Sequence, residues 1–575
     1  MKREILTGIG VGALLASSLR VFVAGVYSSV EKTFFYGVYF PSILGIVLLI
    51  LATALVARIP KKIGGAILGL YIIATLATDA TEYTHLLGAL AIPIILSLTL
   101  EVPTKYLALG MLADLSLRVL ATGGEPLDFY HTRVLLVLLT LPVVYYTIRE
   151  EGKLNKAPFE LYAFATLIEL GLIYPNAILR YSGIKVYYLP LFVGYSFIIT
   201  LALFLGIYLG KKPKIATILL ILGSLTLLIK PLSLIGLPIA LLSSVALLDS
   251  ARNGKIPGVL GPIYFTIMAI LATGAYIGRD IGLSFMEDRL EVVIILASMV
   301  YALTSYKRSV EEVSLPTLKE IAYSIAAFLI IGIITLSAFH RAPVYQERKS
   351  EITVWTYNIH QGFGPYKGTF NGKELVDLLK NHGPDIIGAQ EVVGGMIANA
   401  YQDIPLLLSA RLGYDYEYKP AVEGTYGVAV FSKYPMKTLG EMNLKSVGQA
   451  RPVQKVLIEG LNLVVVNVHL GLSEEERAMQ AEELLKFATT EPKAHIILGD
   501  LNAEPKERAI EILMQEYRDS FEERPPFTFN WGNIDIENID YIMLRKEWNV
   551  RVKDYGCLCE VEVSDHRALW VVIEI

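Results

Sequence analysis

The stretch Ile497-Leu498-Gly499-Asp500-Leu501-Asn502-Ala503-Glu504-Pro505 lies near the end of the 575-residue chain and follows an apolar run. It places a carboxylate and a carboxamide two residues apart at the exit of an expected strand, although such a cluster also makes ordinary Asx turns. Five further stretches carry polar residues at or just past apolar, β-branched runs, so all six predict one site at the edge of a sheet sandwich. These are Thr356-Tyr357-Asn358-Ile359-His360, Ala389-Gln390-Glu391, Val466-Asn467-Val468-His469-Leu470, Ile539-Asp540-Tyr541 and Ser564-Asp565-His566-Arg567.

Apolar strands alternate with helical stretches from Ile352 onward. The pattern predicts a C-terminal α/β domain over residues 351–575, built as a two-sheet β-sandwich flanked by helices. Strands are expected at 352–358, 385–389, 426–432, 454–458, 462–468, 494–499, 539–544 and 567–573, and helices at 373–382, 473–488 and 506–516.

The order and spacing of the six stretches resemble the endonuclease/exonuclease/phosphatase superfamily of metal-dependent phosphodiesterases, which includes nucleases, inositol phosphatases and neutral sphingomyelinases. The resemblance covers about residues 350–575 and implies this sandwich fold. It also implies a metal site formed by Asn358, Glu391 and Asp565. Mg²⁺, or alternatively Mn²⁺, is the expected ion, because a hard cation with oxygen ligands neutralises the charge of a phosphodiester.

The remaining site residues receive roles from the same resemblance. Asp500 would orient the attacking water and Asn502 would bind phosphate. Asp540 would orient the imidazole of His566, which acts either as a base or as a hydrogen-bond donor to the phosphoryl oxygens. His469 would stabilise the phosphate or protonate the leaving oxygen.

Two further residues are candidates for substrate binding. Arg451 could clamp a phosphate with its fork geometry, or it could form a surface ion pair. His360 lies two residues beyond Asn358 and therefore points to the same side, although it could equally be a non-catalytic histidine.

The first 341 residues differ in composition from the rest of the chain. Hydrophobic residues make up 54% of the whole, with a mean hydropathy of +0.50, and nearly all of the excess precedes residue 342. This composition predicts a polytopic α-helical membrane domain over residues 1–341, followed by a short polar linker at 342–350. About thirteen spans are expected, near 4–28, 35–57, 63–79, 86–100, 104–122, 132–148, 158–178, 187–210, 215–230, 232–250, 257–278, 288–306 and 318–339.

The loops between these spans predict an orientation. Seventeen Lys and Arg residues fall on the N-terminal side and eight on the opposite side, so the positive-inside rule places the N-terminus in the cytoplasm. With an odd number of spans the catalytic domain lies outside the cytoplasm. Polar residues inside the spans predict a cavity near Asp79, Glu82 and His85, and a pair between Asp114 and Arg118.

The two halves together favour a lipid substrate. Residues 342–575 contain 24 Lys and Arg against 35 Asp and Glu, a net charge of −11, whereas nucleic-acid binding needs a basic surface. A membrane phospholipid or glycolipid is therefore the expected partner, and the architecture resembles the GPI-anchor ceramide-remodelling proteins. The alternatives are a transporter or receptor with a non-catalytic outer domain and a membrane-tethered nuclease.

The two cysteines carry little information at this stage. Cys557 and Cys559 lie two residues apart on an expected strand, where a disulfide between near neighbours would be strained. The cysteine count therefore does not indicate a redox compartment.

Overall fold

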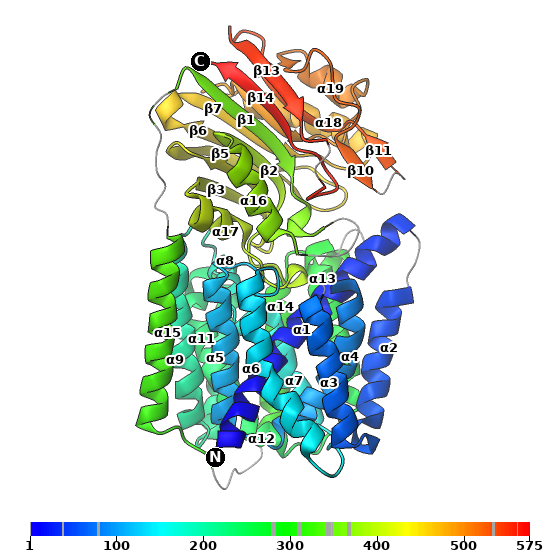
Figure 1. Ribbon diagram of the computed structural model, residues 1–575. Helices are drawn as coiled ribbons and strands as arrows, with labels where there is room; N and C mark the ends of the chain where they lie inside the picture. The colour runs from blue at the N-terminus through cyan, green and yellow to red at the C-terminus, as the bar shows by residue number, and fades with distance from the viewer. Residues whose placement is uncertain are drawn as a thin grey trace.

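The computed structural model comprises an N-terminal helical half and a C-terminal β-sandwich that rests on one end of it (Figure 1). It describes all residues except 1, 37–39, 78–80, 278–282, 307–312, 341–346, 348, 365–369, 532–534 and 560–561. The side chains of 2, 28–36, 40–42, 81–83, 277, 531 and 535 are also not described. Most of the expected linker at 342–350 therefore lies outside the described residues.

The helical half contains fifteen α-helices within the described residues, most of them running between its two ends (Figure 1). A short π-helical turn, η2 (Ile168–Leu172), joins α7 to the bend before α8. The helices are α1 (Lys2–Tyr36), α2 (Phe40–Leu55), α3 (Lys61–Ala77), α4 (Thr81–Thr99), α5 (Thr104–Leu120), α6 (Tyr130–Arg149), α7 (Phe159–Leu167), α8 (Pro175–Tyr181), α9 (Leu189–Leu209), α10 (Pro213–Leu225), α11 (Ser233–Ala246), α12 (Leu248–Arg252), α13 (Leu260–Ile277), α14 (Leu290–Ser305) and α15 (Leu318–Phe339).

The prediction of about thirteen spans is not supported. Among the described residues, four helices are long and apolar enough to cross a membrane, and the bent pair Phe159–Leu172 with Pro175–Tyr181 would make a fifth. The other apolar helices have 10–17 residues, whereas a full crossing needs about 20. Several are shortened by local backbone breaks, such as the 3₁₀ turn Thr226–Leu228 that ends α10.

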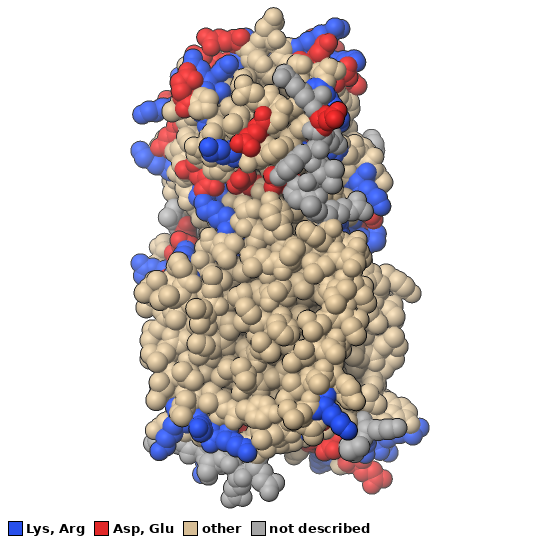
Figure 2. Space-filling model, turned by 90° about the vertical axis from the view of Figure 1, so that its left-hand side faces the viewer, with Lys and Arg blue, Asp and Glu red and all other residues tan. Residues whose placement is uncertain are grey.

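The outer helices nevertheless carry an apolar surface. On α15, Ile330 and Ile333 are 56% and 62% exposed. On the face in Figure 2, an uncharged band separates the charged surface of the sandwich from charges at the opposite end, which are mostly Lys and Arg. Contiguous exposed apolar surface of this kind marks contact with a membrane or a partner.

Loops that were predicted to share a side of the membrane contact one another. Near the N-terminus, Lys61 forms ion pairs with Glu101 and Glu150, each at 2.7 Å. Opposite loops contact the sandwich instead, as in the 2.9 Å ion pair between Arg180 and Asp403. The N-terminus and the sandwich therefore lie at opposite ends of the helical half (Figure 1).

The predicted pairing of Asp114 with Arg118 is wrong. Asp114 accepts hydrogen bonds at 2.8 and 3.1 Å from Arg20 of α1, a helix that packs against α5. Arg118 pairs with Glu125 at 3.3 Å. Sequence spacing along α5 could not show either partner, because both lie on other elements. In the expected outward cavity, Asp79 and the side chain of Glu82 lie outside the described residues, while His85 is fully buried.

The sandwich has the predicted two-sheet architecture. One six-stranded sheet has the order β13-β14-β1-β2-β4-β3, and the other has the order β5-β6-β7-β8-β12-β9. Central strands such as β7 and β8 are buried throughout, which explains their continuous Val, Ile and Leu runs. The strands are β1 (Glu351–Asn358), β2 (Ile386–Val393), β3 (Asp415–Val422), β4 (Tyr426–Ser432), β5 (Met436–Leu444), β6 (Arg451–Ile458), β7 (Leu463–His469), β8 (Ile496–Asp500), β9 (Tyr517–Asp519), β10 (Phe529–Trp531), β11 (Asp535–Glu537), β12 (Asp540–Arg545), β13 (Arg551–Cys557) and β14 (Leu569–Glu574), with helices α16 (Gly372–His382), α17 (Ile404–Leu412), α18 (Glu474–Thr489) and α19 (Arg508–Leu513).

The two halves interlock through buried polar contacts. The segment that follows β2 enters the helical half, where Arg118 donates to the carbonyl oxygens of Ala400 and Tyr401 at 2.9 and 2.5 Å. Asp403 in the same segment pairs with Arg180, and both side chains are fully buried. The sandwich is thus docked on the helices and does not depend on the linker alone for its position.

Candidate active site

Strand register aligns three of the predicted residues at the ends of three neighbouring strands of the second sheet. His469 ends β7 and pairs in register with Asp500, which ends the parallel strand β8. Asp500 in turn pairs with Asp540, the first residue of the antiparallel strand β12. Three adjacent strands therefore present His469, Asp500 and Asp540 side by side.

The first sheet supplies the facing residues. Asn358 ends β1 opposite Gln390 of β2, and Glu391 follows directly. The Nδ2 of Asn358 donates to the Oδ2 of Asp500 at 2.9 Å and to the Oε1 of Glu391 at 3.4 Å. It also lies 3.3 Å from the Nε2 of His566. Asn358 thus connects both sheets at the centre of the site.

His566 is held between two carboxylates. Its Nδ1 lies 2.9 Å from the Oδ2 of Asp540, and its Nε2 lies 3.5 Å from the Oδ2 of Asp500. Burial opposes protonation, but Asp540 and then Asp500 outweigh it and raise the pKa of His566 to about 10. Burial also raises the pKa of Asp500 to about 7, against the opposing effect of His566. This arrangement favours His566 as a hydrogen-bond donor to phosphoryl oxygens and Asp500 as the proton acceptor.

His469 is held in its neutral form. Burial lowers the pKa of His469 well below its usual range, and the neighbouring Arg451 guanidinium lowers it further. The NH1 group of Arg451 lies 2.9 Å from the Nε2 of His469, so this nitrogen acts as the acceptor. Arg451 is 6% exposed and therefore lies in the site, not in a surface ion pair.

The other predicted residues lie around this centre. The backbone N–H of Asn502 donates to the Oδ1 of Asp500 at 2.9 Å, and its side chain donates to the carbonyl oxygen of Leu470. Asp565 accepts a 3.0 Å hydrogen bond from Ser564, whose hydroxyl also lies 2.8 Å from the carbonyl oxygen of Asn358. The Nε2 of His360 lies 3.8 Å from the Oδ2 of Asp565. All ten predicted residues thus belong to one connected region.

The donor set fits a hard divalent cation. Asp500, Asp540 and Asp565 are buried and Glu391 is half-buried, so the site concentrates negative charge that only a cation can neutralise at low cost. One ligand atom each of Asp500, Asp540 and His566 lie within 4.8 Å of one another, and the Oδ1 of Asp540 has no hydrogen-bond partner among the described residues. Because Asp540 and Asp500 already hold His566, the predicted set Asn358, Glu391 and Asp565 remains the better candidate for the ion.

Three supporting residues were missed in the sequence analysis. Gln361 donates to the Oε2 of Glu391 at 3.2 Å, and Ser564 connects Asp565 to Asn358. The Thr528 hydroxyl accepts from the backbone N–H groups of Ile539 and Asp540 at 2.9 and 3.0 Å. Gln361 directly follows His360 and Ser564 directly precedes Asp565, so adjacency to a predicted residue was the available signal for both. Thr528 lies far from Asp540 in the sequence and carried none.

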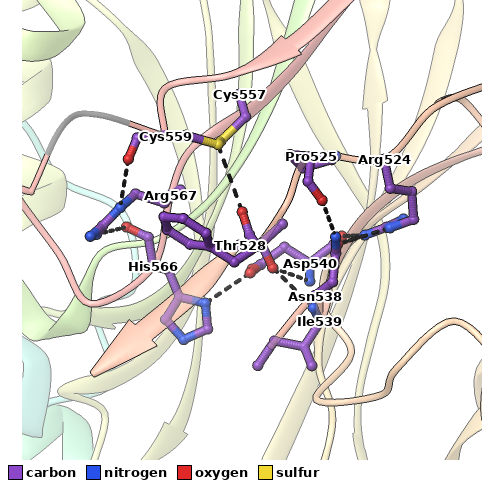
Figure 3. Close-up of a disulfide and its surroundings, with 11 residues drawn as sticks. Arg524, Pro525, Thr528, Asn538, Ile539, Asp540, Cys557, Cys559, His566 and Arg567 are labelled. Atoms are coloured by element: carbon purple, nitrogen blue, oxygen red, sulfur yellow. Dashed lines mark hydrogen bonds and ion pairs between the residues drawn. A yellow bond between two sulfur atoms is a disulfide. The ribbon is translucent and has the colours of Figure 1, made fainter. Parts of the chain in front are cut away.

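A disulfide lies behind the Asp540–His566 pair (Figure 3). Contrary to the expectation from the sequence, Cys557 and Cys559 are bonded to each other. The sulfur of Cys559 lies 3.7 Å from the carbonyl oxygen of Phe527, next to Thr528, and the Cys559 carbonyl oxygen accepts from the Nε of Arg567. The disulfide therefore contacts residues next to Thr528 and His566 and does not itself line the site.

The profile of the endonuclease/exonuclease/phosphatase family matches residues 355–566. An uncharacterized Escherichia coli protein, YbhP, is 30% identical over 179 residues, which span 27% of this chain and 69% of that protein. Solved structures with the sandwich fold include the human Nocturnin catalytic domain with bound sulfate, at 21% identity and a TM-score of 0.32 over 40% of this chain and 99% of that one. A Bacteroides thetaiotaomicron mannosyl-6-phosphatase is similar at 17% identity and a TM-score of 0.32, over 39% and 100% of the two chains.

Proposed function

Since the chain belongs to the endonuclease/exonuclease/phosphatase family of hydrolases through residues 355–566, we propose that it is a membrane-embedded, divalent-metal-dependent phosphodiesterase. Its substrate is a membrane phospholipid or glycophospholipid, which it cleaves in the manner of a phospholipase C. Remodelling of the lipid anchor of a GPI-type molecule is one reaction of this class.

The proposal depends above all on the position of the site. Strand β2 carries Glu391. The segment that follows β2 contacts the helical half through a hydrogen bond from Arg118 and an ion pair with Arg180. The edge of the sandwich that bears the site therefore faces the apolar helices (Figure 1). A substrate anchored in a bilayer would reach this edge without leaving the membrane surface.

The chain's own residues divide the work as follows. Asp500 accepts the proton of the attacking water, and Asn358 holds the carboxylates of Asp500 and Glu391 in place. His566, kept protonated by Asp540, donates a hydrogen bond to a phosphoryl oxygen. Arg451 and His469 face the same phosphate from β6 and β7. A cation held by Asn358, Glu391 and Asp565 would supply neutralisation of the phosphate charge.

Two features support an extracytoplasmic catalytic domain. The basic loops lie at the end of the helical half that holds the N-terminus, and the sandwich lies at the other end. The positive-inside rule assigns the end with the basic loops to the cytoplasm. The Cys557–Cys559 disulfide is typical of an oxidising compartment. Leu472 is 73% exposed, so a Leu472→Cys variant should react with an impermeant thiol reagent on intact cells. Labelling only after permeabilisation would show that the catalytic domain lies in the cytoplasm.

Lipid turnover is tested with the full-length protein reconstituted into phospholipid and glycophospholipid vesicles containing Mg²⁺. We expect release of a phosphorylated headgroup, and its loss in Glu391→Gln. A soluble aryl phosphodiester tests the chemistry separately from lipid access. Cleavage of the soluble ester and of DNA, but of no lipid, would favour the nuclease alternative, which the net charge of −11 argues against. No cleavage of any phosphodiester would favour the non-catalytic receptor or transporter.

A further inference from the structure

A cavity of about 300 Å³ lies in the helical half against the sandwich. Its walls come from α1, α2, α7 with η2, and α13, and from Ile397 and Ala398 of the sandwich. The lining is almost entirely apolar and includes Phe22, Ile43 and Phe265. The volume is at the lower end of the range for small-molecule sites, about 300–1,000 Å³.

One carboxylate interrupts this apolar lining. Glu169 is 3% exposed, and neither of its side-chain oxygens has a hydrogen-bond partner within the described part of the chain. Leaving a buried polar group without a partner destabilises the folded state, and a charged group does so more strongly. An ionisable residue at such a position is retained for a purpose other than stability.

Arg20 acts electrostatically on Glu169, but its donors are already used. Arg20 has five N–H donors, and all five are used, by Asp114, Glu125 and the Tyr174 hydroxyl. Arg20 and Arg118 also balance the charges of Asp114 and Glu125. Glu169 is therefore the carboxylate left over from this cluster.

The backbone is irregular at the same place. Glu169 lies in the π-helical turn Ile168–Leu172, where Gly171 takes a φ of 98°, and the chain then bends by 67° into α8. The Tyr401 hydroxyl of the sandwich donates to the carbonyl oxygen of Glu169, and its ring stacks on Tyr174 at 4.2 Å. π-helical turns of this kind occur frequently at functional sites, and broken helices in membranes line cavities.

Two hydrogen bonds connect the cavity wall to the catalytic site. Next to Ile397 and Ala398, the side chain of Asn399 donates to the carbonyl oxygen of Gln361 at 2.8 Å. Gln361 in turn donates to Glu391. Tyr27 of the cavity wall and Glu391 of the site both act electrostatically on the buried Tyr426.

We propose that this cavity binds a lipid alcohol, with the apolar chain along its walls and the hydroxyl group hydrogen-bonded to Glu169. A hydroxyl both donates and accepts, so it satisfies Glu169 whether the carboxyl group is ionised or protonated, whereas an ammonium only donates. The inference rests on the proposed function, because cleavage of the phospholipase C type releases a lipid alcohol. An acceptor in a transfer reaction belongs to the same chemical class.

The binding test uses the full-length Glu391→Gln protein in nanodiscs, so that it does not depend on turnover. The probe is a photoactivatable diacylglycerol, and the competitors are diacylglycerol and its hydroxyl-free acetylated form. We expect labelling on the cavity-lining parts of α1 and α13, competed by diacylglycerol. Glu169→Leu should weaken this competition about tenfold, because the hydrogen bond between the hydroxyl group and the carboxyl group is lost. Competition by the acetylated form should be weak in both proteins.

The matched control is Glu160→Leu, which removes a buried glutamate of the adjoining helix α7 that does not line the cavity. It should leave competition unchanged, while Glu169→Leu should fold with an unchanged or higher Tm, because leucine removes the unsatisfied carboxylate. Equal competition by both lipids, labelling outside the cavity, or unaltered binding in Glu169→Leu would each overturn the inference.

A second arm separates the two sources of the alcohol and separates this inference from the proposed function. The wild-type protein is given phospholipid vesicles with and without added diacylglycerol. Phosphorylated headgroup transferred to the added alcohol identifies an acceptor, and free headgroup alone identifies a product site. Specific binding with no lipid turnover would refute the proposed function and leave the alcohol site standing.

Discussion

Replacement of Asp540 by asparagine tests the central pair of the site. The Oδ2 of Asp540 lies 2.9 Å from the Nδ1 of His566, and Asp540 is fully buried. The Asp540→Asn variant would keep an acceptor oxygen but lose the charge, which is the largest contribution that raises the pKa of His566 to about 10. Burial would then be opposed mainly by Asp500, so the pKa of His566 would fall and less of it would be protonated at neutral pH.

The expected loss in kcat/KM is about 10²–10³-fold, comparable to removal of one preorganised donor in other enzymes. The expected loss in stability is about 1.5–3 kcal/mol, the contribution of a hydrogen bond to a charged group. Since the folded-state pKa is raised, this stability is fully present below about pH 6.5 and disappears as the pH rises through about 10. The difference in Tm between Asp540→Asn and wild type should therefore be largest at low pH.

The assay is a soluble phosphodiester with the full-length protein in detergent, together with thermal unfolding from pH 5 to 10. Asp385→Asn is the matched control, because Asp385 is also buried and pairs with Lys349 just before β2, at the end of that strand away from Glu391. If Asp540 acts through His566, the double variant with His566→Gln should be no slower than His566→Gln alone. Additive losses, or a Tm difference that grows with pH, would refute the reasoning.

Four further outcomes are expected. EDTA should abolish phosphodiester cleavage, with recovery on addition of Mg²⁺ or Mn²⁺, because four carboxylates otherwise face one another; activity that is indifferent to chelation would exclude the metal. Gln361→Ala should weaken metal activation about 10–100-fold while saturating Mg²⁺ restores kcat, since Gln361 positions Glu391; an unchanged Mg²⁺ titration would contradict this role. Arg451→Met should lower kcat/KM by about tenfold or more and alter the acidic limb of the pH–rate profile, because Arg451 adds to the effect of burial in lowering the pKa of His469; an unaltered limb would contradict the contact. Residues 342–575 expressed alone should lose activity even on the soluble ester, since the segment after Glu391 loses its helical partners; full activity would show that the sandwich is self-sufficient.

Most of the sandwich was predictable because its central strands are buried on both faces. Strands such as β7 and β8 consist of continuous β-branched and apolar runs, and their polar ends marked the site. The unpredicted strands include three at the sheet edges, β3, β5 and β9, whereas the fourth edge strand, β13, was expected only around Cys557. An edge strand is half-exposed and carries charged residues, such as Lys437 and Glu441 in β5. It therefore lacks the continuous apolar run by which the central strands were predicted.

The site residues were predictable for the same reason, and their partners were not. Five of the six stretches stand at or beside a strand end, and Glu391 lies two residues before the end of β2. The hydrogen bond from Gln361 to Glu391 depends on a local turn in which His360 and Gln361 take φ values of 44° and 58°. The predicted pairing of Asp114 with Arg118 was wrong because spacing within one helix carries no information on which helix packs beside it.

The buried interface fixes the sandwich to the helical half, so the two halves are held together by more than the linker. Arg118 and Arg180 are fully buried, and each finds acceptors in the segment that follows β2. Removing the partner of a buried charge costs about 3–5 kcal/mol. Separation of the halves would remove Asp403 from Arg180, whereas Arg118 would keep Glu125 and lose two carbonyl acceptors. The same segment continues from Glu391 at one end and forms the wall of the Glu169 cavity in its middle. A lipid in that cavity and an ion at Glu391 would therefore contact one continuous segment, so binding in the helical half would be coupled to the geometry of the catalytic site through Asn399 and Gln361.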